Sequence, residues 1–174
     1  HLLARHGLAF SAHGQNATLI LKNGLPERLA LRDFIDDVIV CDKDFPETAT
    51  LPPKVQDVLL RLPPDFLIHF IQTTLFICVF RYMSVLLDRR AGLSEETFWS
   101  LAGESVRRYQ ARFPDMADRF DIFGLFDDQY PRLCLNRVRL FTHGYADDDE
   151  RPVPDFQGMV SNPLVYFERK KAAA

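Results

Sequence analysis

The chain has 174 residues, with 21 Lys and Arg against 24 Asp and Glu, which gives a formal net charge of −3. Hydrophobic residues make up 47% and charged residues 26%, proportions typical of soluble globular chains. This composition excludes a disordered tail, a collagen-like segment and a disulfide scaffold. The mild acidity argues against non-specific nucleic-acid binding, which needs a basic surface.

The first third of the chain is predicted to hold a small antiparallel sheet. The segment 1–6 fits the end of a helix that Gly7 terminates. The dipeptide Asn23-Gly24 is typical of a two-residue turn between paired strands. The strand-forming runs around it are residues 8–12, 18–21, 28–31 and 38–40. We therefore expect an antiparallel sheet within residues 8–41.

The middle of the chain is predicted to be helical. The pairs Pro52-Pro53 and Pro63-Pro64 precede expected helices, and proline suits a first turn because its missing N–H has no partner there. Ser94 is a good cap for a further helix, since its hydroxyl can accept from a backbone N–H of the first turn. The expected helices cover residues 54–62, 65–90, 94–113 and 116–123. Residues 132–140 fit a strand or a helix, and residues 147–152 fit an acidic loop.

The segment 66–87 is the only candidate for a membrane span, since it has about the ~20 residues that a bilayer requires. Polar residues recur along it at helical intervals and form one stripe: Asp65, His69, Gln72, Thr73, Arg81, Ser84 and Asp88. A lipid-facing helix would not carry such a stripe. We therefore expect a buried helix with one face toward a polar cleft. His69, Gln72 and Arg81 could line a substrate pocket there, or they could make structural hydrogen bonds.

The three cysteines, Cys41, Cys78 and Cys134, are not arranged in a Cys-X-X-Cys pair or at metal-ligand spacing. We expect reduced thiols in a cytoplasmic protein, with Cys78 in the core because it lies in an apolar run. The chain shows no initiator Met and no leader, so we expect no signal peptide. Its abrupt start, and residues 170–174, which resemble a vector-derived tail, suggest a fragment of a longer enzyme.

The densest group of chemically capable residues is His13-Gly14-Gln15-Asn16, followed one hairpin later by Arg32-Asp33. If the strands around Asn23-Gly24 pair, the second strand brings Arg32 and Asp33 back toward His13 and Asn16. Cationic side chains can neutralise phosphate or carboxylate oxygens, and carboxylate and amide oxygens are the ligands that Mg²⁺ prefers. The same residues also fit a polar turn whose amides satisfy backbone groups. From composition and spacing both interpretations stay open.

These residues resemble a known family. The run 7–16, which ends in His13-Gly14-Gln15-Asn16, and the run Leu31-Arg32-Asp33-Phe34 are similar to the EAHGQN and RDF motifs of the siderophore synthetases that work independently of nonribosomal peptide synthetases. Aerobactin and achromobactin synthetases belong to that family. Residues 133–140 and 162–164 resemble its closing motifs. The resemblance covers nearly the whole chain, with four motifs in order.

The resemblance implies an ATP-dependent ligase in which a carboxylic acid, citrate or a derivative, attacks the α-phosphate of ATP. An amine or alcohol then captures the acyl group. By the family motif, His13 contacts the reacting carboxylate and phosphate, and Arg32 is an anion clamp. Gln15 binds substrate, while Asn16 and Asp33 bind nucleotide and Mg²⁺. We further assign substrate binding to His69, Arg81 and Arg137.

The implied fold is α+β, the C-terminal part of a cupped-hand synthetase. We expect a palm sheet segment with both motifs over residues 1–45, a mainly helical, FhuF-like portion over 46–169, and a vector-derived tail over 170–174. Ser11 stands where the family usually has Glu, which removes a carboxylate near His13. The phosphate-gripping Ser/Thr, Arg and Lys of the family lie upstream of this chain. The chain should therefore hold half of a site and be inactive alone.

Two other functions stay open. A ferric-siderophore reductase or iron-handling domain is related to this family, but such a reductase needs a cysteine cluster for an iron–sulfur centre. A non-catalytic dimerisation module is the second alternative, built from the helices over 54–113. The expected partners are small-molecule acids, amines or alcohols, the missing N-terminal part and a second copy of the chain, with no nucleic acid and no membrane.

Overall fold

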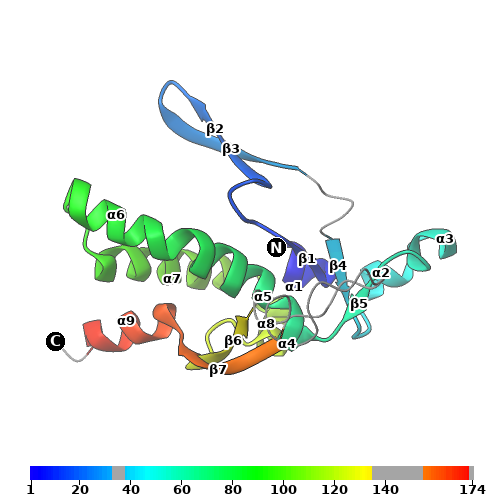
Figure 1. Cartoon of the computed structure of the whole chain (residues 1–174). Coiled ribbons are helices and arrows are strands. Elements are labelled where there is room, and N and C mark those ends of the chain that lie inside the picture. Colours follow the sequence, from blue (N-terminus) through cyan, green and yellow to red (C-terminus); the bar gives the residue numbers. More distant parts are fainter. Residues whose placement is uncertain (33–37, 135–154, 173–174) are drawn as a thin grey trace, which may run out of the picture. The chain divides into compact units, whose positions relative to one another are not determined.

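The computed structural model describes residues 1–32, 38–134 and 155–172 (Figure 1). Small sheets alternate with helices along the chain, which confirms the predicted α+β class. The chain divides into two compact units, His1–Leu125 and Phe126–Ala174. The predicted division into a palm segment, a helical portion and a tail stays a prediction.

The first unit opens with helix α1, Leu2–His6, which ends at Gly7 in the left-handed conformation, as the sequence predicts. Strand β1, Leu8–Phe10, pairs antiparallel with β4, Val38–Cys41. A short third strand, β5, Arg61–Leu62, then joins β4 in parallel. The predicted strands are confirmed, but they form two sheets instead of one.

The second sheet is the hairpin of β2, Ala17–Lys22, and β3, Leu25–Leu31. Asn23 and Gly24 both have positive φ, 54° and 79°, which is the conformation that a tight hairpin turn requires. The register shifts between Ile20 and Leu21, so β3 carries a bulge near the turn. The hairpin therefore follows directly from the Asn-Gly dipeptide.

The expected helix over 54–62 is wrong. Two short helices, α2, Pro46–Ala49, and α3, Pro53–Gln56, are followed by the strand β5. Residues 60–62 join the sheet because β4 and the residue after it donate to them. The N–H of Val40 donates to the carbonyl of Leu60, and the N–H of Asp42 donates to that of Leu62, each at 2.9 Å. Pairing with a distant strand thus outweighs the local helix preference.

A long helix runs from Pro64 to Ala91, close to the predicted range. Its segments are α4, Pro64–Leu67; α5, His69–Ile71; the π-helix η1, Gln72–Phe80; and α6, Arg81–Ala91. It is the one helix in the described residues that is long and apolar enough to cross a membrane, judged by length and composition alone.

The expectation that this helix is buried is wrong, since only 22% of its most apolar window is covered. The covered positions include polar ones, His69, Gln72, Thr73 and Ser84, whereas Cys78 is exposed and not in the core. The most apolar residues are therefore not the most buried ones. In the middle of the helix, the side that carries the polar stripe faces the rest of the protein.

The helices that follow agree with the sequence. Helix α7, Glu95–Ala111, begins at Ser94, whose Oγ accepts from the N–H of Thr97 at 3.1 Å. A 3₁₀ turn, η2, Pro114–Met116, leads into α8, Ala117–Phe123. An aromatic cluster joins the π-helix to α7: Phe76, Phe80, Phe98 and Trp99. The core lies between the β1–β4 sheet, the start of the long helix and α8: Ala9, Cys41, Phe45, Leu67, Ile68 and Phe123.

The second unit pairs β6, Gln129–Cys134, with β7, Asp155–Ser161, and ends in α9, Pro163–Ala172. Asn162, fully buried, donates from its amide to the carbonyl of Asp127 at 2.9 Å and accepts from the N–H of Leu164 at 3.1 Å. The run 162–164 therefore caps α9. Residues 129–134 are a strand, and the remainder of 132–140 and the acidic run 147–152 lie outside the described residues.

Candidate functional site

The residues His13–Asn16 form a tight turn between β1 and β2. The carbonyl of His13 accepts from the N–H groups of Asn16, at 3.0 Å, and of Ala17, at 3.1 Å. The N–H of Gln15 points to Nδ1 of the His13 ring at 3.3 Å. Because Nδ1 accepts this bond, the neutral ring carries its proton on Nε2. The turn therefore leaves Nε2–H of the neutral ring pointing away from the Gln15 amide.

The hairpin brings the second motif back to this turn. The N–H of Arg32 donates to the carbonyl of Asn16 at 2.9 Å, which confirms that the return strand carries Arg32 to Asn16. Asn16 is buried, with 1% of its surface exposed, whereas Gln15 and Arg32 are exposed and His13 is half-buried. Asp33 lies outside the described residues.

Space is open beside the turn. A Cβ atom placed on Gly14 would meet nothing within 4 Å, so the backbone there is accessible to a ligand. Ser11, which stands where the family usually has Glu, is buried with 7% of its surface exposed. The site therefore combines the half-buried His13, the exposed Arg32 and the buried Asn16 at a turn whose backbone is accessible at Gly14.

The donors suit a hard cation only in part. The described part of the chain contains no group of three or more His, Cys, Asp or Glu side chains that could hold a metal ion by themselves. Mg²⁺ commonly uses one or two protein oxygens and takes its remaining ligands from phosphates and water. Among the two residues that the family motif assigns to Mg²⁺, Asn16 is buried and Asp33 lies outside the described residues.

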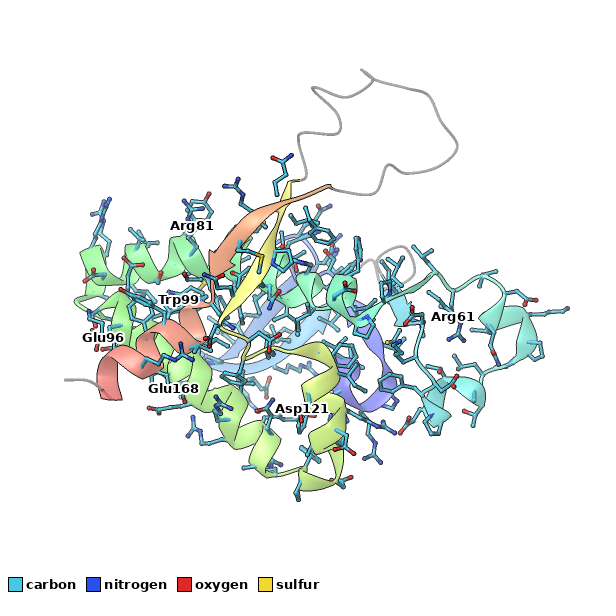
Figure 2. The ribbon with its side chains drawn as sticks, turned by 90° about the horizontal axis from the view of Figure 1, so that it is seen from below. Arg61, Arg81, Glu96, Trp99, Asp121 and Glu168 are labelled. Atoms are coloured by element: carbon cyan, nitrogen blue, oxygen red, sulfur yellow. The ribbon has the colours of Figure 1, made fainter. Side chains whose placement is uncertain are left out.

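The predicted substrate residues on the long helix do not come together. His69 is buried, and its Nδ1 lies 3.1 Å from Oγ1 of Thr73. Burial lowers the pKa of His69 below its usual value, an effect that the nearby Asp65 carboxylate partly opposes, so the ring is neutral at neutral pH. Arg81 lies on α6 (Figure 2) and is exposed. Its Cζ lies over the Tyr82 ring, 5.7 Å from the ring centroid. Arg137 lies outside the described residues.

Gln72 lies on the predicted polar stripe of the long helix and is buried. It is 1% exposed, and its Oε1 has no hydrogen-bond partner among the described residues. It begins the π-helix, a type of distortion that is frequent at functional sites. Ser84, by contrast, has a structural explanation, because its Oγ lies 3.1 Å from Oε2 of Glu95 and so joins α6 to α7.

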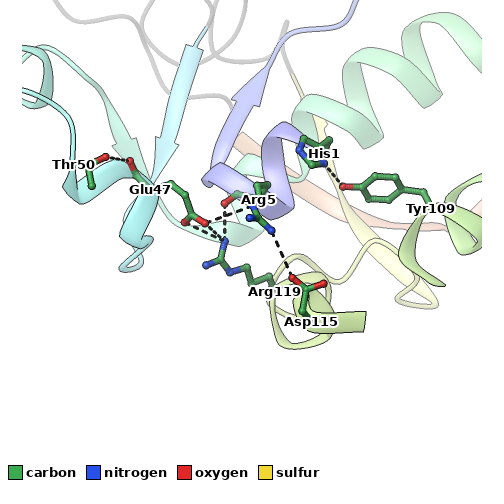
Figure 3. A network of polar contacts seen from close by, with 7 residues as sticks. All are labelled: His1, Arg5, Glu47, Thr50, Tyr109, Asp115 and Arg119. Atoms are coloured by element: carbon green, nitrogen blue, oxygen red, sulfur yellow. Dashed lines mark hydrogen bonds and ion pairs between the residues drawn. The ribbon is translucent and has the colours of Figure 1, made fainter. Parts of the chain in front are cut away.

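A polar network that the sequence did not predict fixes the frame around the first sheet (Figure 3). Nη1 of Arg119 donates to the carbonyl of Arg5 at 2.6 Å and to Oε1 of Glu47 at 3.1 Å. The hydrogen bond from Arg119 lowers the pKa of the Glu47 carboxyl below its usual value. Arg5 also pairs with Asp115 at 3.6 Å. The partners lie far apart in the sequence, so no local pattern indicates the network.

A hollow of about 760 Å³ lies in the second unit, between β6, β7 and α9. Its lining includes Asp128, Ser161, Tyr166 and Arg169. Arg169 donates to the carboxylate of Asp128 at 2.6 Å, so the cation already has an anionic partner. The described lining therefore fits a polar surface depression better than an anion site.

Comparison with known proteins shows which family the chain resembles. The family described as "Ferric iron reductase FhuF-like transporter" matches residues 1–148. The rhizobactin siderophore biosynthesis protein RhbF of Rhizobium meliloti (strain 1021) is 79% identical over the whole chain, and the match spans 29% of that protein. Aerobactin synthase of Escherichia coli is 42% identical over 94% of the chain and 28% of its own length.

A solved structure agrees with these relatives. Aerobactin synthetase IucC from Klebsiella pneumoniae superimposes with a TM-score of 0.82 at 38% identity, over 97% of this chain and 28% of that one. The chain thus spans less than a third of the length of the relatives it matches. It belongs to the FhuF-like family and corresponds to the C-terminal part of the longer siderophore synthetases.

Proposed function

We propose that this chain supplies one half of the active site of an ATP-dependent siderophore synthetase. The complete enzyme would adenylate a carboxylic acid, citrate or a derivative, and then join the acyl group to an amine or alcohol. The observation that carries the proposal is the bond from the N–H of Arg32 to the carbonyl of Asn16, which unites the two motifs at the base of the hairpin. The named relatives supply the reaction class.

The His13 ring is suited to bind oxygen atoms that become more negative during the reaction. Its Nδ1 accepts from Gln15, so Nε2–H is available to a phosphate or carboxylate oxygen. In the first step a carboxylate oxygen of the acid attacks the α-phosphorus, and the bond from that phosphorus to the pyrophosphate oxygen breaks. The exposed Arg32 guanidinium can bind the same oxygens, and such fixed positive groups stabilise the developing charge.

Asn16 and Asp33 would hold Mg²⁺ together with the phosphates, and the ion would neutralise charge on the triphosphate. Gln15, exposed beside His13, would bind the acid. In the second step the amine or alcohol attacks the acyl carbon, and the bond to AMP breaks. His69, Arg81 and Arg137 stay candidates for substrate binding. Since His69 is buried and neutral, it would act through hydrogen bonds and not through charge.

The phosphate-gripping residues would come from the upstream part of the enzyme, and the cytoplasm, where ATP is available, is the expected compartment. A reductase is a second candidate because the family description names one. Its chemistry is less well supported, since Cys41 is completely buried, with a pKa raised by that burial, whereas Cys78 is exposed on the π-helix. A role in dimerisation is compatible with the ligase, and the exposed Tyr82, Met83 and Leu86 of α6 support it.

The proposal is tested with the full-length parent enzyme, ATP, Mg²⁺ and citrate, by measuring pyrophosphate release. His13→Ala should reduce the rate by about 10²-fold or more, the range in which positioned acid–base and charge-stabilising groups contribute. His6→Ala is the matched control: His6 lies on α1, outside the His13 turn, with its ring beside that of His1, and its replacement should leave the rate unchanged. Full activity of His13→Ala, or no pyrophosphate with any polycarboxylate, would contradict the proposal.

A further inference from the structure

The β2–β3 hairpin has an exposed apolar face. Leu19 pairs directly with Leu29, and residues directly opposite one another share a face. Leu21 and Leu31 lie two residues further along their strands and therefore share it too. The exposed fractions are 52% for Leu19, 57% for Leu21, 63% for Leu29 and 42% for Leu31. These four residues are called the leucine face below, and the opposite face carries Thr18, Ile20, Arg28 and Ala30.

A hairpin of this kind is not expected to be stable in water without a covering partner. The two strands pair only with each other among the described strands (Figure 1). An isolated two-stranded hairpin is at best marginally stable, and a contiguous exposed apolar patch marks an interaction site. The leucine face therefore requires a partner in the complete enzyme.

The contact should use the face of the hairpin and not the edge of β3. Pro26 cannot donate a ladder hydrogen bond, and the bulge next to it interrupts the strand. Close to the turn, Lys22 and Glu27 form an ion pair at 3.5 Å, which adds charge there. Such features commonly protect an edge strand from pairing.

The relatives are much longer than this chain, which indicates what covers the leucine face. This chain covers 29% of RhbF and 28% of the E. coli aerobactin synthase, so most of each relative lies outside it. Asn16 and Arg32 lie at the two ends of the hairpin, where the N–H of Arg32 donates to the carbonyl of Asn16. We infer that the upstream part of the same polypeptide packs on the leucine face and thereby brings its phosphate-binding residues to Asn16 and Arg32. The inference rests on the proposed function, which places the other half of the site upstream.

The test compares two adjacent positions in the full-length parent enzyme. Leu29→Cys places a thiol on the leucine face, and Arg28→Cys places one on the opposite face, one residue away. Each variant is treated with a thiol reagent, and modification of the hairpin peptide is followed by mass spectrometry. Position 29 should react at least about tenfold more slowly than position 28, because it reacts only when the covering part opens locally. Equal rates would overturn the inference.

Dilution separates the upstream part from a second copy of the chain. Protection supplied by the same polypeptide does not depend on protein concentration, whereas protection by a second copy disappears when a dimer dissociates. Concentration-independent protection at position 29 supports the inference, and protection lost on dilution overturns it.

A second pair of variants tests the energetic role of the leucine face. Leu19→Thr combined with Leu29→Thr keeps residues that favour strands but makes the face polar. The backbone amides of the hairpin in the full-length enzyme should then exchange hydrogen at least about tenfold faster. The matched control, Ile20→Thr combined with Ala30→Thr, should change the exchange much less. Equal effects of the two pairs would contradict the inference.

None of these measurements requires ATP or an acid. Protection at position 29 in an enzyme that releases no pyrophosphate would retain the interface and reject the proposed function. Pyrophosphate release by an enzyme whose position 29 is fully reactive would retain the proposed function and reject the interface.

Discussion

Gly7 gives a quantitative test of how tightly the first sheet packs on its neighbours. Its φ of 62° lies in the left-handed region, which costs an L-residue about 1–2 kcal/mol. A Cβ at this position would lie 2.8 Å from Cδ2 and 3.0 Å from Cγ of the Phe45 ring. Phe45 is 3% exposed and belongs to the core, so its ring has little room to move, and overpacking of this kind costs about 1–3 kcal/mol. Gly7→Ala should therefore lower the free energy of unfolding by about 2–5 kcal/mol.

Gly92 is the matched control for Gly7. It also ends a helix with positive φ, 68°, but a Cβ there would meet nothing within 4 Å, so Gly92→Ala should lose only about 1–2 kcal/mol. Urea unfolding followed by the fluorescence of Trp99, the single tryptophan, reports on the unit that contains both glycines. Equal losses for the two variants would show that the Phe45 ring moves aside without penalty and would refute the packing argument. Phe45→Leu, added to Gly7→Ala, should recover part of the difference.

The same unfolding assay tests two further contacts. Ser94→Ala removes the Oγ that accepts from the N–H of Thr97 and should destabilise by about 1 kcal/mol, whereas Ser100→Ala, which removes a buried Oγ without a partner among the described residues, should change stability by less than about 0.5 kcal/mol. A loss at Ser100 as large as that at Ser94 would contradict the capping argument. The pKa of Glu47 is lowered by Arg119 from its usual 4.5, so its contribution to stability is present above that pH and is lost as the pH falls through the lower folded-state pKa. Glu47→Gln should therefore flatten the acid side of the stability profile measured by urea unfolding, and an unchanged acid side would contradict this.

The features that the sequence predicts correctly have local causes. The turn at Asn23-Gly24, the stop at Gly7 and the cap at Ser94 each depend on residues within one or two turns. The approach of Arg32 to Asn16 is also predictable, because the hairpin register follows from the turn. The approach of the two motifs to each other could therefore be predicted from the sequence alone.

The features that sequence reasoning missed depend on distant partners. Residues 60–62 become a strand because β4 is beside them, and Arg119 meets Glu47 across 72 residues of chain. The role of Arg137 and the position of Asp33 stay predictions, since both lie outside the described residues. No local pattern contains the information about which strand or carboxylate a segment will meet.

The long helix shows a different kind of error. Its period correctly predicts two unlike faces, yet in mid-helix the polar side is covered, with His69 and Gln72 each at 1% exposure, while Leu86 is 58% exposed. A hydrophobic pattern indicates that one face of a helix is buried. It does not indicate whether that face packs against this segment of the polypeptide or against another one. The leucine face of the hairpin follows the same logic. In a chain that spans 28–29% of its relatives, an exposed apolar face is therefore first to be tested as a contact with the rest of the enzyme.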